Sequence, residues 1–313
     1  MSDITGDDPN VRAPLAHLGG ERPPAPAWFE RAVAQRPERS TIRAADVDIE
    51  LLTWGERGRP GLLLIHGGMA HADWWSFIAP FFAGEHRVAA LSLSGMGGSS
   101  WRDRYALDLH QAEALAAAEV AGLFDAGPPV VVGHSFGGGV TTYMARNAGE
   151  RLRAAVVVDA GVRPPDKRWR GPPPGDNRPN KVYPTFEQAL ARFRLSPAQP
   201  CTELHILDHI GRASLRPVEG GWRWRFDPNL WDKMDRSQRE EQEAELGGAR
   251  CPIAFVWGER SRIMGPDTVD YTRRHAPAGT PMFAIPEAEH HVLLDQPLAL
   301  VAALRGLLSA WPV

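Results

Sequence analysis

The spacing of hydrophobic residues changes once along the chain. Between Ile42 and Trp54, apolar and polar side chains alternate, which predicts antiparallel strands at the edge of a sheet. From Gly61 onward, short continuous apolar runs appear instead: GLLLIHG, HRVAALSL, PPVVVGH, RAAVVVDAG, CPIAFVWG and TPMFAI. Runs of this length that are rich in Val, Ile and Leu are typical of parallel strands buried on both faces.

Helical segments lie between several of these runs. Residues 107–124 are rich in Ala, Leu and Glu, residues 139–148 follow the third run, and residues 297–310 close the pattern. A shorter helix is expected at AWFERAVAQ. Strands that alternate with helices indicate an α/β fold with a mostly parallel central sheet flanked by helices.

One long interval, residues 162–250, interrupts this alternation. A structureless loop of that length is implausible in a compact domain. Its helix-like segments (TFEQALARFRL and ELHILDHIGRASL) and its hairpin-like GGWRWRF indicate an inserted, mainly helical cap over the strand ends. The Pro- and Gly-rich first 27 residues are expected to be loose. The predicted organisation is an N-terminal extension (1–40), a core (41–162 and 248–313) and a cap (163–247).

Composition excludes several classes of protein. The net charge of the 313 residues is −3, so no basic surface predicts binding to nucleic acid or anionic lipid. Two cysteines are too few for a disulfide framework, and the polar N-terminus does not resemble a signal peptide. No apolar run approaches the roughly 20 residues of a membrane span. We therefore expect a cytoplasmic monomer or homodimer that acts on a small molecule.

The motif VVVGHSFGGGV contains the strongest chemical signal. Gly133, Ser135 and Gly137 form G-x-S-x-G between a β-branched strand and a Gly-rich helix start. A serine on this sharp turn projects its hydroxyl from the sheet, and the following helix directs its N-terminal amides at developing negative charge. Ser135 is therefore the candidate nucleophile.

These motifs in this order resemble the α/β-hydrolase superfamily of serine hydrolases with an inserted cap, from Ile42 to the C-terminus. In LLLIHGGMAHADWW, the resemblance implies that the amide of Gly68 is one oxyanion donor, and that of Phe136 is the second. In LSLSGMGGSSW, Ser92 replaces an aspartate that is structural in the family.

The segment PEAEHHVLLDQPLALV implies the general base. The family's pattern places a proline seven residues after the catalytic histidine, and Pro297 stands seven after His290. The resemblance therefore selects His290 rather than His291. The pair has no partners at metal-ligand spacing, so no metal site and no cofactor are expected.

The acid is missing from its usual place. In most of the family it lies in a G-x-x-D loop after the strand FVWG, where this chain has Ser261. Asp159, at the end of the preceding strand, is the favoured substitute because neighbouring parallel strands end at the same edge of the sheet. Glu259 is the alternative, and an absent acid is a third possibility.

The resulting hypothesis is a serine hydrolase that cleaves a carboxylic ester, lactone or thioester of an apolar or aromatic small molecule through an acyl-enzyme. A C–C bond hydrolase of a β-diketone and a non-catalytic binding protein remain alternatives. Arginines of the insert (Arg168, Arg170, Arg223 and Arg225) either steer an anionic substrate or lie in solvent. The expected pocket residues, for some of which core packing is equally compatible, are Met69, Trp74, Trp75, His134 and Trp222.

Overall fold

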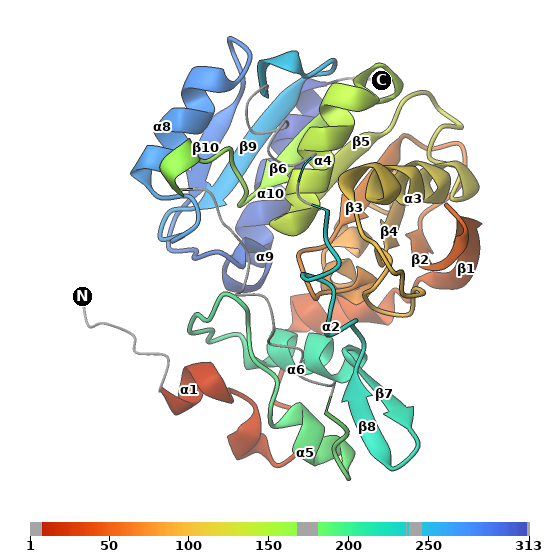
Figure 1. The fold of residues 1–313 in the computed structure, drawn as a ribbon, viewed down its shortest axis with the longest axis vertical. Helices are drawn as coiled ribbons and strands as arrows, with labels where there is room; N and C mark the ends of the chain where they lie inside the picture. Colours follow the sequence, from red (N-terminus) through yellow and green to blue (C-terminus); the bar gives the residue numbers. More distant parts are fainter. Residues whose placement is uncertain (1–7, 168–180, 236, 238–245, 312–313) are drawn as a thin grey trace.

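The centre of the protein is an eight-stranded sheet with the strand order β1-β2-β4-β3-β5-β6-β9-β10 (Figure 1). The computed structural model describes residues 8–167, 181–235, 237 and 246–311. The strands are β1 (Glu38–Ala44), β2 (Val47–Trp54), β3 (Gly61–Ile65), β4 (Arg87–Leu91), β5 (Val130–His134), β6 (Ala154–Val158), β9 (Ile253–Gly258) and β10 (Met282–Ile285).

Strand direction follows the two hydrophobic patterns. The alternating segment forms the antiparallel pair β1–β2, joined by a turn at Ala45 and Asp46, whose φ angles of 44° and 65° are left-handed. Strand β2 is antiparallel to β4, and all other neighbours are parallel. The predicted α/β-hydrolase fold is confirmed.

Both faces of the sheet are covered, because successive residues of a strand point in opposite directions. In β5, Val130 and Val132 pack into one apolar cluster, whereas Val131 packs into another. Helices α3 (Leu107–Val120), α4 (Phe136–Asn147) and α8 (Pro266–His275) cover the face of Val131, and α10 (Pro297–Ala310) covers the opposite face. None of the described helices is long and apolar enough to cross a membrane.

The remaining helical elements are short. They connect the longer elements along the whole chain. They are α1 (Pro9–Arg12), η1 (Ala16–Leu18), α2 (Ala27–Ala34), η2 (Ala72–Trp75), η3 (Ala79–Phe81), η4 (Gly149–Arg151), η5 (Pro165–Lys167), η6 (Leu246–Gly248) and α9 (Val292–Asp295).

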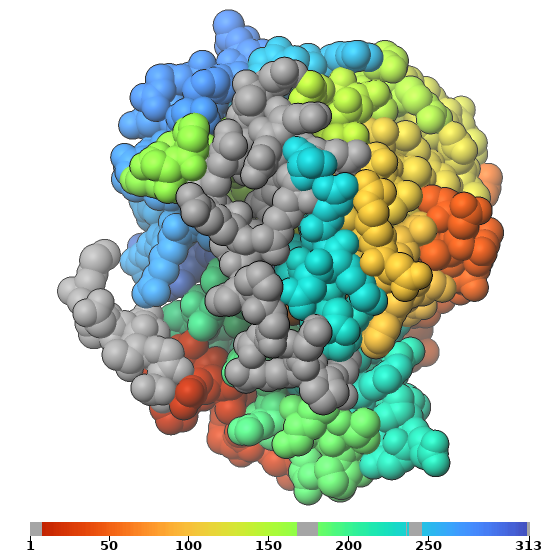
Figure 2. All heavy atoms as spheres, viewed as in Figure 1, coloured from red at the N-terminus to blue at the C-terminus, as the bar shows by residue number. Residues whose placement is uncertain are grey.

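The insert between β6 and β9 lies at the carboxyl ends of the parallel strands (Figure 1). Its described part contains α5 (Phe186–Leu190), α6 (Leu204–Ala213) and the antiparallel hairpin β7 (Leu215–Val218) and β8 (Gly221–Trp224). The first predicted helix ends early, at Leu190. In the space-filling view, these segments and the N-terminal residues form the lower end of the molecule (Figure 2). Most of the charged run DRSQREEQEAEL lies outside the described residues.

Part of the N-terminal segment that was expected to be loose is packed, and the predicted helix that follows it packs as well. Val11 is 3% exposed, Leu15 is 1% exposed and Phe29 is 5% exposed. Phe29 contacts the first turn of α6, with its ring 4.7 Å from that of His205. The amphipathic α6 gives these apolar side chains a surface to bury, which the local Pro and Gly content does not reveal.

Ser92, where the family has an aspartate, donates a hydrogen bond to the carboxylate of Glu50 over 2.7 Å. The same carboxylate accepts hydrogen bonds from Gly98 N at 2.9 Å and from the Arg225 guanidinium at 2.6 Å. Burial raises the pKa of Glu50, but Arg225 and the hydrogen bonds outweigh it, so the pKa lies below its usual value. A carboxylate from the adjacent strand thus replaces the missing one.

We expect Glu50→Gln to lower the free energy of unfolding at pH 7 by roughly 2–4 kcal/mol. The change removes the nearer counter-ion of the largely buried Arg225 and leaves only the more distant Asp73, at 4.0 Å. The Glu50 pKa is lowered on folding, so the loss should be complete above about pH 4.5 and shrink as the pH falls through the folded-state pKa. Urea titrations across pH would measure it. The control Glu56→Gln removes an exposed carboxylate and should change stability by less than about 0.5 kcal/mol; equal losses in both variants would contradict the assignment.

Candidate active site

The turn between β5 and α4 holds Ser135 in a strained conformation, with φ of 53° and ψ of −116°. The two glycines of the motif permit this turn. A Cβ on Gly133 would lie 2.2 Å from the carbonyl oxygen of Gly137, and a Cβ on Gly137 would lie 2.5 Å from that of His66. Real Cβ atoms do not approach backbone oxygens so closely. Only glycine therefore allows the chain to cross here and present the serine.

Three of the six described non-glycine residues with left-handed backbone follow central strands near this site. Met69 has φ of 58° and Asp159 has φ of 47°, and like Ser135 each follows the carboxyl end of a central strand. Such conformations cost free energy and persist where the surrounding structure enforces them, frequently at functional sites. The loop that holds Gly68, the turn of the candidate nucleophile and the position of the candidate acid thus each carry one strained residue.

The structure places His290 against Asp159 and not against Glu259. The distance between His290 Nδ1 and Asp159 Oδ1 is 2.8 Å, and the aspartate is fully buried. His290 Nε2 has no protein partner among the described residues, so it is available to another group. Glu259 is exposed, and its carboxylate accepts a hydrogen bond from the amide of Glu287.

Ser261 supports the acid that lies on the neighbouring strand. Its hydroxyl donates to Asp159 Oδ1 over 2.7 Å and accepts from the amides of Ile263 and Met264, each at 3.2 Å. Because two amides occupy the lone pairs of the hydroxyl oxygen, its proton is directed at the carboxylate. Gly258 N donates to Asp159 Oδ2 at 2.8 Å. From the sequence, Ser261 was noted only as the position where the usual acid is missing, and its hydrogen bond to Asp159 was not predicted.

The expected oxyanion donors lie close together. Phe136 is the first residue of α4, where a backbone amide has no partner within the helix. A Cβ on Gly68 would lie 3.7 Å from the Cβ of Phe136 and 2.7 Å from the ring of Trp231. Trp231, from the insert, therefore packs directly on the oxyanion loop. This contact could not be predicted from the sequence, because Trp231 and the loop lie far apart in the chain.

Three buried histidines meet beneath the turn. The His290 ring centroid lies 4.9 Å from that of His134 and 4.8 Å from that of His291. His134 Nε2 and the carbonyl oxygen of His290 are 2.9 Å apart, which tethers the loop of the base. Burial lowers the pKa of His134 to about 3 and lowers that of His291 well below its usual value. Both rings are therefore neutral near pH 7.

These three histidines correct the expectation that His290 and His291 have no partner at ligand spacing. Their ligand atoms, one from each of His134, His290 and His291, lie within 4.8 Å of one another. Neutral imidazoles suit Zn²⁺ and related transition metals. A metal held through His290 Nε2 would occupy the nitrogen that a general base needs, so this donor set fits an inhibitory cation better than a catalytic one.

The insert also contacts the loop of the base through Gln199. Its side-chain oxygen accepts a hydrogen bond from the amide of His291 at 3.0 Å, and its nitrogen donates to both oxygens of Asp295 at 2.9 and 3.0 Å. Asp295 in turn accepts from Glu289 N, and burial raises its pKa to about 6. No motif in the sequence identified Gln199, because its role depends on contacts 92 and 96 residues away.

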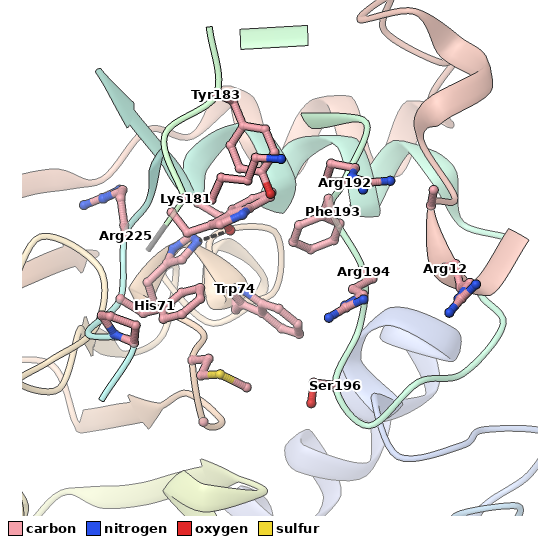
Figure 3. A pocket seen from close by; sticks show the side chains of 17 residues that line it. Arg12, His71, Trp74, Lys181, Tyr183, Arg192, Phe193, Arg194, Ser196 and Arg225 are labelled. Atoms are coloured by element: carbon pink, nitrogen blue, oxygen red, sulfur yellow. Dashed lines mark hydrogen bonds between the residues drawn. The ribbon is translucent and has the colours of Figure 1, made fainter. Parts of the chain in front are cut away.

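A pocket of about 770 Å³ opens between the insert and the oxyanion loop (Figure 3). Its volume lies within the range of small-molecule sites. It extends to Gly68, but Ser135 and His290 are not among its lining residues. These are Arg12, Ala13, Gly68, Met69, His71, Trp74, Lys181, Tyr183, Arg192, Phe193, Arg194, Ser196, Ser214, Trp224, Arg225, Phe226 and Pro228.

Two of the expected pocket residues, Met69 and Trp74, line this cavity. The other three lie elsewhere. Trp75 is fully buried in the core, and His134 is buried beneath the nucleophile. Trp222 packs its ring 4.9 Å from that of Phe186, and Trp224 lines the pocket instead. Trp222 and Trp224 are two residues apart on the hairpin, so the sequence pattern could not tell which of them lines the pocket.

The arginines named from the sequence also separate. Arg225 lines the pocket, whereas the Arg223 guanidinium lies 5.4 Å from the centre of the Trp101 ring. Arg168 and Arg170 lie outside the described residues.

Comparison with known proteins identifies relatives along most of the chain. Esterase Rv0045c of Mycobacterium tuberculosis is 26% identical over 290 residues, which cover 87% of this chain and 90% of the esterase. Its solved structure matches with a TM-score of 0.66 at 23% identity and covers 98% of this chain and 100% of that one.

Two further relatives differ in the share of the chain that they match. Lipase LipV of Mycobacterium tuberculosis is 33% identical over 116 residues, 37% of this chain and 43% of the lipase. The dihydrolipoyllysine-residue acetyltransferase component of the acetoin cleaving system of Pseudomonas putida is 34% identical over 276 residues, 84% of this chain and 68% of that protein.

The model of the alpha/beta hydrolase family matches residues 62–304. The chain therefore belongs to the alpha/beta hydrolase family.

Proposed function

We propose that this protein is a serine hydrolase that cleaves a carboxylic ester or thioester through an acyl-enzyme. The observation that carries the proposal is the 2.8 Å contact between Asp159 and His290, with Ser135 on the adjacent strained turn. An esterase and a lipase are among the relatives, which supports ester hydrolysis.

In the first half of the reaction, the hydroxyl oxygen of Ser135 attacks the substrate carbonyl carbon. His290 Nε2 takes the serine proton, while Asp159 holds Nδ1–H and stabilises the imidazolium. The amides of Gly68 and Phe136 stabilise the oxyanion. When the tetrahedral intermediate collapses, the bond to the leaving oxygen or sulfur breaks, and His290 returns the proton to the leaving group.

In the second half, water replaces the alcohol or thiol. His290 Nε2 removes a proton from the water, and the hydroxide attacks the acyl carbon. Collapse of this second intermediate breaks the bond to the Ser135 oxygen, which takes the proton back from His290 Nε2, and the acid is released. His290 Nε2 makes no hydrogen bond to Ser135 or to any other described residue, so no other group competes for it, and the serine–histidine contact would form in the substrate complex.

The geometry weakens the case for a non-catalytic binding protein. That alternative rested on the missing acid at position 261. Asp159 supplies a carboxylate at hydrogen-bonding distance from His290, and Ser261 and Gly258 stabilise it.

The pocket supports a substrate with an apolar or aromatic part. Trp74, Phe193 and Trp224 contribute ring surface to its walls, and Gly68 of the oxyanion loop lies at one end. An apolar group that is buried against these rings contributes binding free energy in proportion to the area removed from water.

A fluorophosphonate probe should label the wild-type protein on Ser135, because the activated hydroxyl attacks phosphorus as it attacks a carbonyl. Intact-mass spectrometry should show one adduct in the wild type and none in Ser135→Ala. The control Ser309→Ala removes an exposed hydroxyl on α10 and should be labelled like the wild type. A wild-type protein that the probe does not label would contradict the proposed nucleophile.

Asp159→Asn should lower kcat by about 10³–10⁴-fold, because the amide no longer fixes the tautomer and orientation of His290. Glu259→Gln, the matched control on the alternative acid, should stay within about twofold of wild type, as expected for an exposed side chain. Steady-state kinetics on one ester would compare them. If Glu259→Gln showed the larger loss, the acid would be Glu259.

Ser261→Ala should lower kcat by about five- to tenfold with little change in KM, because Asp159 loses one of its donors while the pocket keeps its lining. A double variant distinguishes support of the carboxylate from a general structural role of Ser261. Asp159→Asn combined with Ser261→Asp returns a carboxylate to the family's usual loop and should be faster than Asp159→Asn alone. A double variant with no gain in kcat would count against the equivalence of the two positions.

A further inference from the structure

The pocket has a charge opposite to that of the whole protein. Among the described residues that line it, five are cationic (Arg12, Lys181, Arg192, Arg194 and Arg225), and none is Asp or Glu. The complete chain has a net charge of −3. Random placement of surface charge would not concentrate one sign around a cavity in an acidic protein, so the accumulation requires an explanation.

We infer that the substrate carries a negative charge, separated from its scissile ester or thioester by an apolar segment. This inference rests on the proposed hydrolase function and specifies the class of substrate. The carbonyl would lie at Gly68, the apolar segment against the aromatic wall, and the anion at the arginines.

Arg192 and Arg194 are held in position by the residues between and after them. Phe193 and Leu195 are 6% and 3% exposed and belong to the main apolar core, whereas Arg192 and Arg194 are exposed. This alternation fixes the backbone and directs both guanidinium groups outward to the same cavity. In the described part of the chain, neither has an acidic partner that would neutralise it. Their charge is therefore available to a ligand.

Lys181 adds positive charge from another segment. Its ammonium group lies 5.2 Å from the centre of the Tyr183 ring, and no carboxylate of the described residues pairs with it. Arg225 differs, because its ion pair with Glu50 at 2.6 Å balances its charge. Figure 3 shows Lys181 and Arg225 on one side of Trp74, and Arg194 and Arg12 on the other. The excess charge thus comes mainly from the segments of Lys181 and of Arg192 and Arg194.

The aromatic residues connect this charge to the catalytic groups. The Trp74 ring lies 5.6 Å from that of His291, the neighbour of the base, and Trp74 lines the pocket together with Gly68. A ligand in the cavity would therefore be within reach of Gly68, of the aromatic rings and of the cationic side chains, all of which line it. Arginine forks bind carboxylate and phosphate through paired hydrogen bonds, so both anions fit the same chemistry.

The test uses esters that differ only at the end remote from the carbonyl. The neutral substrate is 4-nitrophenyl hexanoate, and the anionic one is the mono-4-nitrophenyl ester of hexanedioic acid. A third ester, with a terminal phosphate, distinguishes a carboxylate from a phosphate preference. We expect wild-type kcat/KM to be at least about tenfold higher for one of the anionic esters than for the neutral one. Equal values, or a preference for the neutral ester, would overturn the inference.

Variants identify the residues responsible. The double variant Arg192→Gln and Arg194→Gln should lower the anionic-to-neutral ratio of kcat/KM by about tenfold, because two forked donors are lost. The control Arg273→Gln removes an exposed arginine on α8, paired with Asp270, and should leave the ratio unchanged. An unchanged ratio in the double variant would show that these arginines do not bind the anion. Raising the salt concentration should lower the ratio in the wild type, since the side chains are exposed and their field is screened.

A binding measurement separates this inference from the proposed catalysis. Calorimetric titration of Ser135→Ala with hexanedioic acid monoamide and with hexanamide should show tighter binding of the anionic amide. If that preference appeared while the wild type hydrolysed none of the esters, the anionic pocket would stand and the proposed hydrolysis would be overturned. If the wild type hydrolysed the esters without any preference in rate or binding, only the inference about charge would fail.

Discussion

The carboxylate of Asp159 is fully removed from water, and the arrangement of the loops around it follows from that constraint. Burial of an uncompensated charge costs several kcal/mol, so the protein must surround the carboxylate with donors. Gly258 N, Ser261 Oγ and His290 Nδ1 come from the end of β9, from the loop after it and from the loop after β10. The acid thus joins three chain segments, and the orientation of His290 is one consequence of its hydrogen bonding.

The same solution appears at two places in the molecule. Ser92 and Ser261 both occupy positions where the family has an aspartate, and each donates its hydroxyl proton to a carboxylate from an adjacent strand. Glu50 serves the first position and Asp159 the second. In both cases a carboxylate from a neighbouring strand lies at hydrogen-bonding distance from the serine. Such exchanges keep the electrostatics of a site while altering the motif by which the site is recognised.

The elements that depend on local pattern were predictable from the sequence. Continuous apolar runs identified the parallel strands, and the glycines around Ser135 identified the strained turn. Each of these signals is contained in a stretch of only a few residues. The contacts of Gln199 and Trp231 were not predictable, since they join the insert to loops far away in the chain. Trp75 and Trp222 could not be separated from Trp74 and Trp224, because hydrophobicity does not report which cavity a ring faces.

Gln199 also bears on how such enzymes diversify. An insert that only covered a pocket could be exchanged between relatives as an independent module, with the catalytic apparatus left intact. Here one amide side chain of the insert holds the backbone beside the base and the carboxylate of Asp295. A change of insert that altered substrate choice would therefore also move the loop of His290. In this chain, a single side chain of the insert is therefore bonded to the segment that carries His290.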